Sequence, residues 1–327
     1  QVIVLTDAAH MPETSLTNAV AYEDWLAEAD DDFAWADFDE RTAAGLCYTS
    51  GTTGDPKGVL YSHRSNMLHA FSMSAVDMLN VGCRDVVMPV VPMFHANGWS
   101  LAFSAPLNGT GLVMPGALMD GRSIAELLTT YKVSMTAAVP TVWLMLLAHL
   151  DETGTKLPDL KRVVIGGSAC PRAMTEAFQE RYGGGGCHAC PLKPETDHLS
   201  AEAKLDLQEK QGYPPMTVEM KITDDAGTEL PWDGRTFGRL KVRGPAVARE
   251  YYKGAGGDIL DDDGFFDTGD VAHIDPDGYM QITDRSKDVI KSGGEWISSI
   301  ELENIAVGHP DVAEAAVIGV AHPVWGE

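Results

Sequence analysis

The sequence has 327 residues, of which 44% are hydrophobic, and this is enough for one large or two smaller globular domains with a substantial buried core. Its 48 acidic and 24 basic side chains give a formal net charge of -24, which argues against nonspecific binding to nucleic acid because the phosphate backbone would be repelled. No apolar run reaches the roughly 18 residues expected of a membrane span, and five cysteines without a secreted-scaffold pattern favour a reducing cytoplasm.

The first forty residues combine a strand-like start with an acidic stretch. Residues 1–5 resemble an interior strand without an initiator methionine, and the chain stops soon after another apolar strand, so we expect both ends to be cut. Residues 28–40 are rich in Asp and Glu, and we expect a surface connection there because runs of like charge usually face solvent. Aromatic side chains should anchor it, namely Trp25, Phe33, Trp35 and Phe38.

A loop rich in glycine and hydroxyl groups follows a predicted strand over residues 43–48. Residues 48–58 read Tyr-Thr-Ser-Gly-Thr-Thr-Gly-Asp-Pro-Lys-Gly. Glycines let backbone N–H groups close around phosphate oxygens, the hydroxyls add donors, and Lys57 adds a positive charge. The P-loop pattern does not fit, since Lys57 has no adjacent Ser or Thr for magnesium. The composition therefore predicts a different kind of polyphosphate-binding loop, although a plain Ser/Thr/Gly-rich surface loop is the alternative.

Beyond this loop, helical spacing of apolar residues over 67–79 precedes a buried strand at 85–90, and strand, loop and helix in this order predict an α/β sandwich. Residues 92–99 then place His95 among aromatic side chains, with Trp99 at the end. Two interpretations of His95 stay open, namely a substrate-facing residue and a buried, hydrogen-bonded histidine at a strand-to-helix corner.

Strands and helices continue to alternate, which predicts largely parallel sheets packed between helices. We expect a helix over 124–131, a strand over 133–137 and a helix over 141–150 that begins after a proline. The strand at 162–165 runs into Gly166 and Gly167, and glycines at the carboxyl end of a strand let a flat ligand lie against the backbone. Adenine is the candidate ligand for this turn.

A segment of unusual composition, Gly183 to Pro191, contains four consecutive glycines. Its Cys187, His188 and Cys190 are too tightly spaced for the usual zinc pattern, so a shortened or altered segment is the alternative to a metal site. Ser200 can cap a helix that reaches residue 210, and alternating apolar residues over 218–242 then predict a β-rich region.

A second cluster of polar residues lies at 264–285, where a turn at 275–278 separates two predicted strands. Asp270 in a Thr-Gly-Asp sequence can accept hydrogen bonds from both hydroxyls of a ribose, and Arg285 can meet the same ribose or a phosphate. Taken alone, Thr-Gly-Asp is also a common structural turn.

Together these motifs resemble those of the adenylate-forming superfamily, which includes acyl-CoA synthetases, luciferases of the firefly type and adenylation domains of peptide synthetases. The resemblance implies phosphate contacts from the loop, namely Thr49, Ser50, Gly51, Thr52, Thr53, Gly54 and Lys57. It implies an acid pocket at His95 and Trp99, adenine contacts at Gly167, Ser168 and Ala169, and ribose or phosphate contacts at Asp270 and Arg285. It also implies a hinge at Lys287 and a CoA-bordering loop at Gly293 and Gly294.

Two expected features of that superfamily are missing from this sequence. No aromatic-Gly-x-Thr-Glu motif follows residue 182, so the magnesium-binding glutamate is not found and Glu195 does not replace it. The chain also ends before the region that carries the lysine used in adenylation. A nucleotide-binding remnant or pseudoenzyme that serves as an assembly partner is therefore the alternative to an active enzyme.

The resemblance implies that the protein is an AMP-forming acid:CoA ligase that uses ATP, Mg²⁺ and CoA. Some stretches look closest to bacterial medium-chain fatty-acyl-CoA synthetases and methylmercaptopropionate-CoA ligases, so a medium-chain fatty acid or a similar acid is the expected substrate. The expected fold is α/β, with sandwich subdomains, a β-rich subdomain and the start of a small α+β domain. Residues 1–284 should form the large domain and residues 285–327 the hinge and small domain, and a homodimer is possible.

Overall fold

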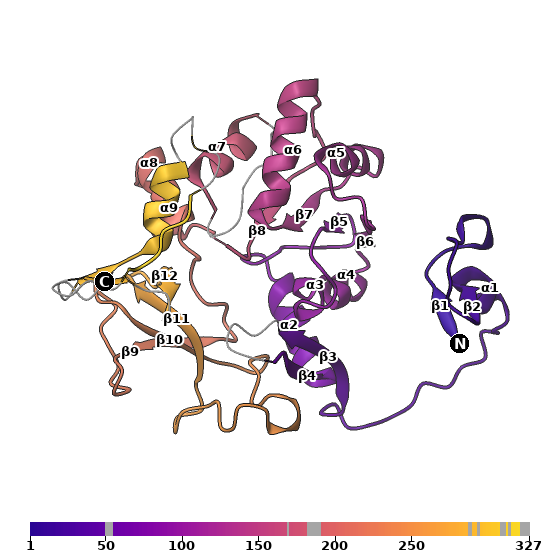
Figure 1. Cartoon of the computed structure of the whole chain (residues 1–327), viewed down its shortest axis with the longest axis horizontal. Helices are drawn as coiled ribbons and strands as arrows, with labels where there is room; N and C mark the ends of the chain where they lie inside the picture. The colour runs from indigo at the N-terminus through magenta and orange to yellow at the C-terminus, as the bar shows by residue number, and fades with distance from the viewer. Residues whose placement is uncertain are drawn as a thin grey trace. The chain divides into compact units, whose positions relative to one another are not determined.

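The computed structural model describes residues 1–49, 55–168, 170–181, 191–286, 290–292, 295–307, 312 and 315–320. These belong to two compact units, Gln1–Glu40 and Arg41–Glu327, and each is described by itself (Figure 1).

The first unit is a small α/β element. Strands β1 (Val2–Val4) and β2 (Ala19–Ala21) pair in parallel, so the strand expected at the start of the chain is confirmed. Between them lies the short 3-10 helix η1 (Ala8–His10), and α1 (Tyr22–Ala27) follows β2.

The aromatic residues in and before the acidic stretch are largely exposed and not buried in a core, which differs from the anchoring role expected from the sequence. Phe33, Trp35 and Phe38 are 69%, 90% and 52% exposed, and Trp25 in α1 is 43% exposed. The rings of Phe33 and Trp35 instead stack edge to face, with centroids 5.1 Å apart. Two aromatic rings can therefore cover part of each other's surface without a core beneath them.

The second unit contains a four-stranded sheet in which neighbouring strands run parallel. Its strands, in spatial order, are β6 (Gly111–Leu112), β5 (Val86–Pro89), β7 (Met135–Ala138) and β8 (Arg162–Ile165). The helices of this region are α2 (His63–Ser74), α3 (Ala96–Trp99), α4 (Leu101–Asn108), α5 (Gly121–Thr130), α6 (Pro140–Thr153) and α7 (Arg172–Arg181). The predicted alternation of strands and helices is confirmed.

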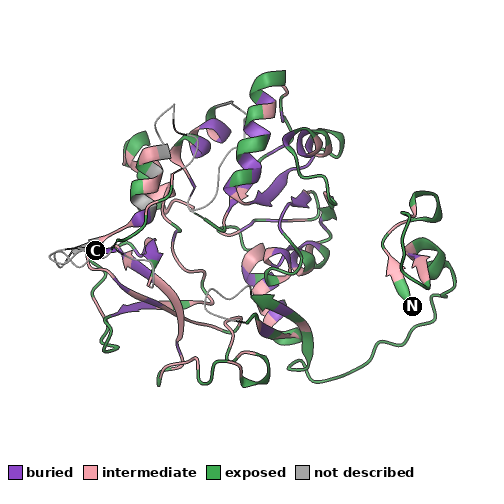
Figure 2. Cartoon of the chain, in the orientation of Figure 1, coloured by how far each residue is buried: buried purple, intermediate pink, exposed green. Residues whose placement is uncertain are grey.

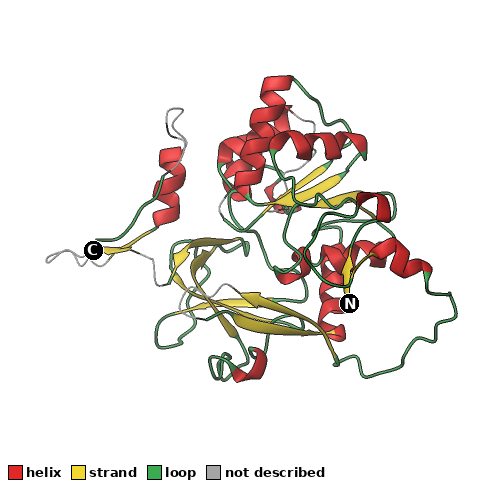
Figure 3. Cartoon of the chain, turned by 45° about the vertical axis from the view of Figure 1, so that its right-hand side comes forward, coloured by secondary structure: helices red, strands yellow, loops and turns green. Residues whose placement is uncertain are grey.

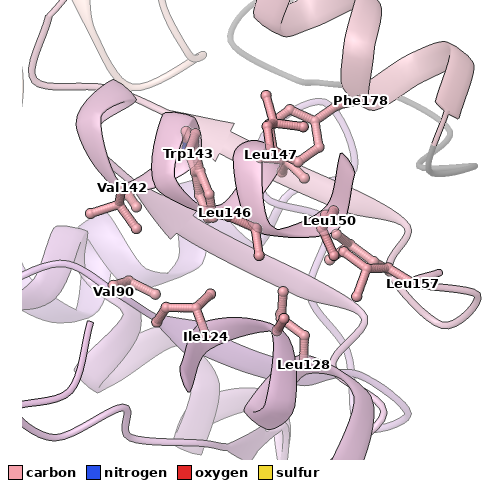
Figure 4. Packing of buried hydrophobic residues seen from close by; sticks show 14 of the residues in the cluster. Val90, Ile124, Leu128, Val142, Trp143, Leu146, Leu147, Leu150, Leu157 and Phe178 are labelled. Atoms are coloured by element: carbon pink, nitrogen blue, oxygen red, sulfur yellow. The ribbon is translucent and has the colours of Figure 1, made fainter. Parts of the chain in front are cut away.

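Helices cover both faces of this sheet. Since successive strand residues point to opposite faces, strands β5, β7 and β8 contribute side chains to the hydrophobic clusters on both sides. On one face, Met88 and Val163 pack in a cluster with α5, α6 and α7, whose side chains Ile124, Leu128 and Leu146 face one another (Figure 4). On the other face, Val87 packs with Leu101 of α4 and other side chains. Strands β5, β7 and β8 are accordingly largely buried, whereas the edge strand β6 and the outer helix surfaces are exposed (Figure 2).

The helix ends follow the local sequence, with one difference. Pro140 is the first residue of α6, and Gly154 ends it at φ 68°, a left-handed conformation that glycine adopts without steric penalty. The helix predicted to reach residue 79 ends instead at Ser74, because Ala75 is extended and a turn follows. Leu79 still reaches the core from this turn, where it is 7% exposed.

The glycine-rich loop connects two antiparallel strands, β3 (Ala43–Thr49) and β4 (Lys57–Ser62). The order expected from the sequence, which was strand, loop and helix, therefore omitted strand β4 between the loop and the helix. Residues 57–62 pair with β3, with Leu46 opposite Leu60, and only then does α2 begin. Its first turn is closed by reciprocal hydrogen bonds between Ser62 and Ser65.

The β-rich region is an antiparallel sheet in the order β12-β11-β10-β9 (Figure 3). Its strands are β9 (Glu219–Thr223), β10 (Gly238–Arg243), β11 (Phe266–Ile274) and β12 (Met280–Arg285). The predicted turn at 275–278 is present, with the Asp275 carboxylate accepting from the backbone N–H groups of Asp277 and Tyr279.

The remaining elements are short. They are η2 (Pro194–Thr196), α8 (Ala201–Gln208), η3 (Tyr252–Gly254), β13 (Ile290–Ser292), β14 (Glu295–Ile297) and α9 (Ser299–Val307). The predicted cap of α8 is confirmed, since the Ser200 hydroxyl accepts from Ala203 N. Asp284, 4% exposed, accepts hydrogen bonds from the backbone N and the hydroxyl of Ser299, which ties α9 to β12.

Candidate functional site

Three stretches that are far apart in the sequence line one pocket of about 350 Å³. The first is the end of β8 and the turn after it, which contribute residues 165–168 and Cys170. The second is the end of the α8 segment, residues 209–211, and the third is the β11–β12 hairpin, which contributes Asp270, Ile282 and Arg285. Four residues predicted from the sequence, Gly167, Ser168, Asp270 and Arg285, therefore lie around the same space.

Glycine is required at two positions of the turn after β8. A Cβ atom at Gly166 would lie 2.7 Å from Cη2 of the Trp99 ring, and one at Gly167 would lie 2.9 Å from Cγ1 of Val139. Gly167 also has φ 83°, which side chains rarely adopt. The turn thus keeps a bare backbone surface at the pocket, in the way that a flat ligand against this surface would need.

Asp270 and Arg285 are brought together by strand pairing. They are direct partners in the antiparallel pair of β11 and β12, and Arg285 Nη1 lies 3.0 Å from Asp270 Oδ1. The Asp270 side chain is 16% exposed, and burial raises the pKa of this carboxyl; the Arg285 guanidinium and a hydrogen bond from Thr268 offset only part of that effect. The pocket therefore holds a carboxylate that can accept hydrogen bonds beside an arginine that is 58% exposed.

Residues 209–211 are the part of the pocket that the sequence analysis missed. Lys210 Nζ lies 2.6 Å from Asp275 Oδ2, and both side chains are at most 16% exposed, which fixes this segment to the β11–β12 turn. The side-chain oxygen of Gln211 accepts from the backbone N–H of Ile282 at 2.6 Å. Burial raises the pKa of Glu209, and the Arg172 guanidinium offsets part of this rise. No local pattern marks these residues, because their roles depend on a hairpin some seventy positions further along the chain.

The described part of the glycine-rich loop lies at the end of the β3–β4 hairpin. Thr49 pairs with Lys57 there, and its hydroxyl donates to the Lys57 carbonyl at 3.4 Å. The Lys57 ammonium lies over the ring of Tyr251, 5.0 Å from the centroid. Lys57 does not line the pocket described above.

His95 precedes a strained turn that contains Trp99. Five consecutive residues, 96–100, have φ between 45° and 68°, and four of them are not glycine. Left-handed backbone costs on the order of 1 kcal/mol per non-glycine residue, so surrounding contacts must hold the turn. The Asn97 oxygen accepts from Cys47 Sγ at 3.4 Å, and the Trp99 ring packs on Gly166. The His95 side chain is exposed, which excludes the buried alternative for this histidine.

Several predicted positions lie outside the described residues. These are Ser50, Gly51, Thr52, Thr53, Gly54, Ala169, Lys287, Gly293 and Gly294. Cys187, His188 and Cys190 of the unusual segment also lie outside them, so the zinc alternative is untested.

Across the described ranges, no group of three or more His, Cys, Asp or Glu side chains is arranged to hold a metal ion. Within these same ranges, none of the helices has both the length and the apolar character needed to cross a membrane.

Comparison with known proteins identifies relatives along most of the chain. The model of the AMP-binding enzyme family matches residues 1–252, and that of the AMP-binding enzyme C-terminal domain matches residues 301–327. A 3-methylmercaptopropionyl-CoA ligase of Ruegeria lacuscaerulensis is 51% identical over 94% of this chain and 59% of its own length. A medium-chain-fatty-acid–CoA ligase of Ectopseudomonas oleovorans is 49% identical over 94% of this chain and 58% of its own.

The fold also matches solved structures. O-succinylbenzoate coenzyme A synthetase from Bacillus subtilis, in complex with ATP and a magnesium ion, is 26% identical with a TM-score of 0.75, over 99% of this chain and 68% of that one. The α/β fold expected from the sequence is thus that of adenylate-forming enzymes. The chain spans less than two thirds of the length of the curated relatives named above.

Proposed function

Because the chain belongs to the AMP-binding enzyme family, we propose that it is an AMP-forming acid:CoA ligase. A carboxylate oxygen of the acid attacks the α-phosphorus of ATP, and the bond to pyrophosphate breaks to leave acyl-AMP. The CoA thiolate then attacks the acyl carbon, forms the thioester and releases AMP. Two of the relatives are named as ligases for 3-methylmercaptopropionate and for medium-chain fatty acids, which supports a medium-chain or similar acid as substrate.

One observation carries this proposal. The turn with Gly167 and Ser168 and the pair of Asp270 and Arg285 come from distant parts of the chain, yet they line one pocket. In our proposal adenine lies against the turn, Asp270 accepts hydrogen bonds from the ribose hydroxyls, and Arg285 contacts the ribose or a phosphate. These are positioning and charge contacts, which supply most of the catalysis in phosphoryl-group chemistry.

The other proposed roles rest on position in the sequence. Residues 49–54 and Lys57 hold the departing pyrophosphate, and His95 and Trp99 border the acid. Lys287 is the hinge between a large domain of residues 1–284 and a small domain of residues 285–327, and Gly293 and Gly294 border CoA. When bound, Mg²⁺ would neutralise phosphate charge. A cytoplasmic location, which the cysteine usage favours, and a homodimer also remain predictions.

Acid-dependent exchange of pyrophosphate into ATP tests the first half-reaction. We expect exchange with the intact protein, and a loss of about tenfold or more in Lys57→Ala and in Asp270→Ala, because each removes a charged contact to the nucleotide. Lys253→Ala is a matched control, since Lys253 also lies over a tyrosine ring, 5.3 Å from the centroid of Tyr252, and has no proposed role.

The outcomes separate the active enzyme from the alternative. Exchange that is unchanged in both variants would overturn the proposed roles. AMP binding without any exchange would favour the alternative, a nucleotide-binding remnant. The similarity to ligases argues against that alternative.

A further inference from the structure

The segment that follows α8 extends the edge of the antiparallel sheet. Strand β12 is at the end of the strand order, and Gln211 and Gly212 lie beside it. Gln211 N donates to Met280 O at 3.1 Å, and Met280 N donates to Gly212 O at 2.8 Å. The next free donor of the strand, Ile282 N, donates to the side-chain oxygen of Gln211 at 2.6 Å. Backbone and side chain of Gln211 are thus both attached to β12.

This attachment fixes which way the Gln211 amide points. A backbone N–H group can only donate, so the amide must turn its oxygen toward Ile282. The amide nitrogen, with two N–H donors, is left on the other side of the group. No atom of the described residues accepts from it, and Gln211 is exposed and lines the pocket.

The neighbouring polar groups of this wall do not supply an equivalent donor. Lys210 is committed to Asp275, and Glu209 can only accept when ionised. Asp270 is likewise an acceptor. Gln211 is therefore the neutral donor that residues 209–211 offer to a ligand in this pocket.

We propose that Gln211 is a nucleotide-binding residue whose amide N–H groups donate to an acceptor atom of the adenosine moiety, either a ring nitrogen of the purine or an oxygen of the ribose. This inference rests on the proposed function, since it assigns the pocket to the nucleotide. It gives two residues that line the pocket opposite tasks. Asp270 accepts from the hydroxyls of the ligand, whereas Gln211 donates to its acceptors.

Calorimetric titration of the intact protein with AMP tests this role. Gln211→Glu keeps an oxygen for Ile282 N–H and replaces the donor by a second acceptor, and Gln211→Met removes the donor without adding charge. We expect both variants to bind AMP at least about tenfold more weakly, which corresponds to the loss of one hydrogen bond to the ligand. The unfolding temperature of Gln211→Glu should stay within about 1 °C of the wild type, because its bond to Ile282 remains.

Gln208→Glu is the matched control. Gln208 belongs to the same segment, its oxygen accepts from Gln179 Nε2 at 3.2 Å, and it does not line the pocket. We expect its AMP affinity to stay within twofold of the wild type. Equal weakening in Gln208→Glu and Gln211→Glu, or a loss in Gln211→Glu that is absent from Gln211→Met, would assign the effect to charge and overturn the role of Gln211.

The same titration separates this inference from the proposed function. If the wild type binds AMP and both Gln211 variants bind it equally well, only the role of Gln211 fails. If the wild type does not bind AMP, the assignment of the pocket to a nucleotide fails, and the role of Gln211 fails with it.

Discussion

Replacing Gly166 by alanine should force the Trp99 ring away from position 166. A Cβ atom at this position would lie 2.7, 3.2 and 3.3 Å from three atoms of the ring, Cη2, Cζ2 and Cζ3. Gly166 does not have a positive φ, so its backbone accepts alanine and the ring alone opposes it. To bring the shortest contact to the 3.4 Å of ordinary van der Waals distance, the ring must withdraw by about 0.7 Å.

The cost of this shift depends on how freely Trp99 can move. Its backbone lies in the left-handed turn, and the next residue, Ser100, is 2% exposed. An inserted methyl group in a packed region destabilises by about 1–3 kcal/mol when neighbours cannot relax. We therefore expect Gly166→Ala to lower the free energy of unfolding by an amount in this range.

Equilibrium unfolding in urea of four proteins provides the assay: the wild type, Gly166→Ala, Trp99→Leu and the double variant. Leucine at position 99 removes the clashing ring atoms, so Gly166→Ala should be nearly harmless in that background, with a coupling energy of at least about 1 kcal/mol. Effects that add within about 0.5 kcal/mol would refute the reasoning. Gly154→Ala tests backbone strain separately, because it has φ 68° and no atom within 4 Å of the added methyl group.

Three further variants test electrostatics in the fold and the site by urea unfolding at several pH values. Burial acts to raise the pKa of Asp85, but hydrogen bonds from Ser134 and Gly82 and the charge of Arg162 leave this pKa below its ordinary value. The contribution of the Asp85 carboxylate to folding stability is therefore present above pH 4 and lost as the pH falls further. Asp85→Asn should be less stable than the wild type at pH 7 but approach it near pH 3. The pKa of Asp270 is raised, so ionisation of this carboxyl weakens the folded state as the pH rises above 3.8. Asp270→Asn should therefore be more stable than the wild type at pH 7, lose that advantage near pH 4, and bind AMP more weakly. A stability advantage that persists at pH 4 would contradict this sign. Lys210→Met leaves a largely buried carboxylate without its partner and should destabilise by about 3 kcal/mol, whereas a loss below about 1 kcal/mol would mean that solvent replaces the ion pair.

Elements with strong local signals were predicted closely from the sequence. The strand at 162–165 has the bounds that its apolar, β-branched residues indicated. The turn at 275–278 formed where its Asp and Gly residues placed it, and Ser200 caps α8 as expected. The interactions that determine the turn and the cap lie within a few residues of the chain, and the strand carries its own signal in its β-branched residues although its partner β7 is more distant.

Features that depend on distant contacts were not predictable in this way. Ala96 and Trp99 have no preference for left-handed backbone, and only packing against β3 and the turn after β8 accounts for their conformation. The pairing of Asp270 with Arg285 depends on a register shift between Val271 and Ala272, which no local pattern encodes. The importance of Gln211 arises from a strand edge that forms about seventy residues later in the chain.

The pocket joins residues 165–168, 209–211 and 270–285, so a ligand that contacts all three closes two long chain loops at once. It would then act as a reversible cross-link, which favours the folded state by an amount that grows with ligand concentration. Opening of any one wall would release the ligand from the other two. In the presence of saturating AMP, backbone amides of β8, the segment after α8 and β12 should therefore gain protection from hydrogen exchange together, as one cooperative unit.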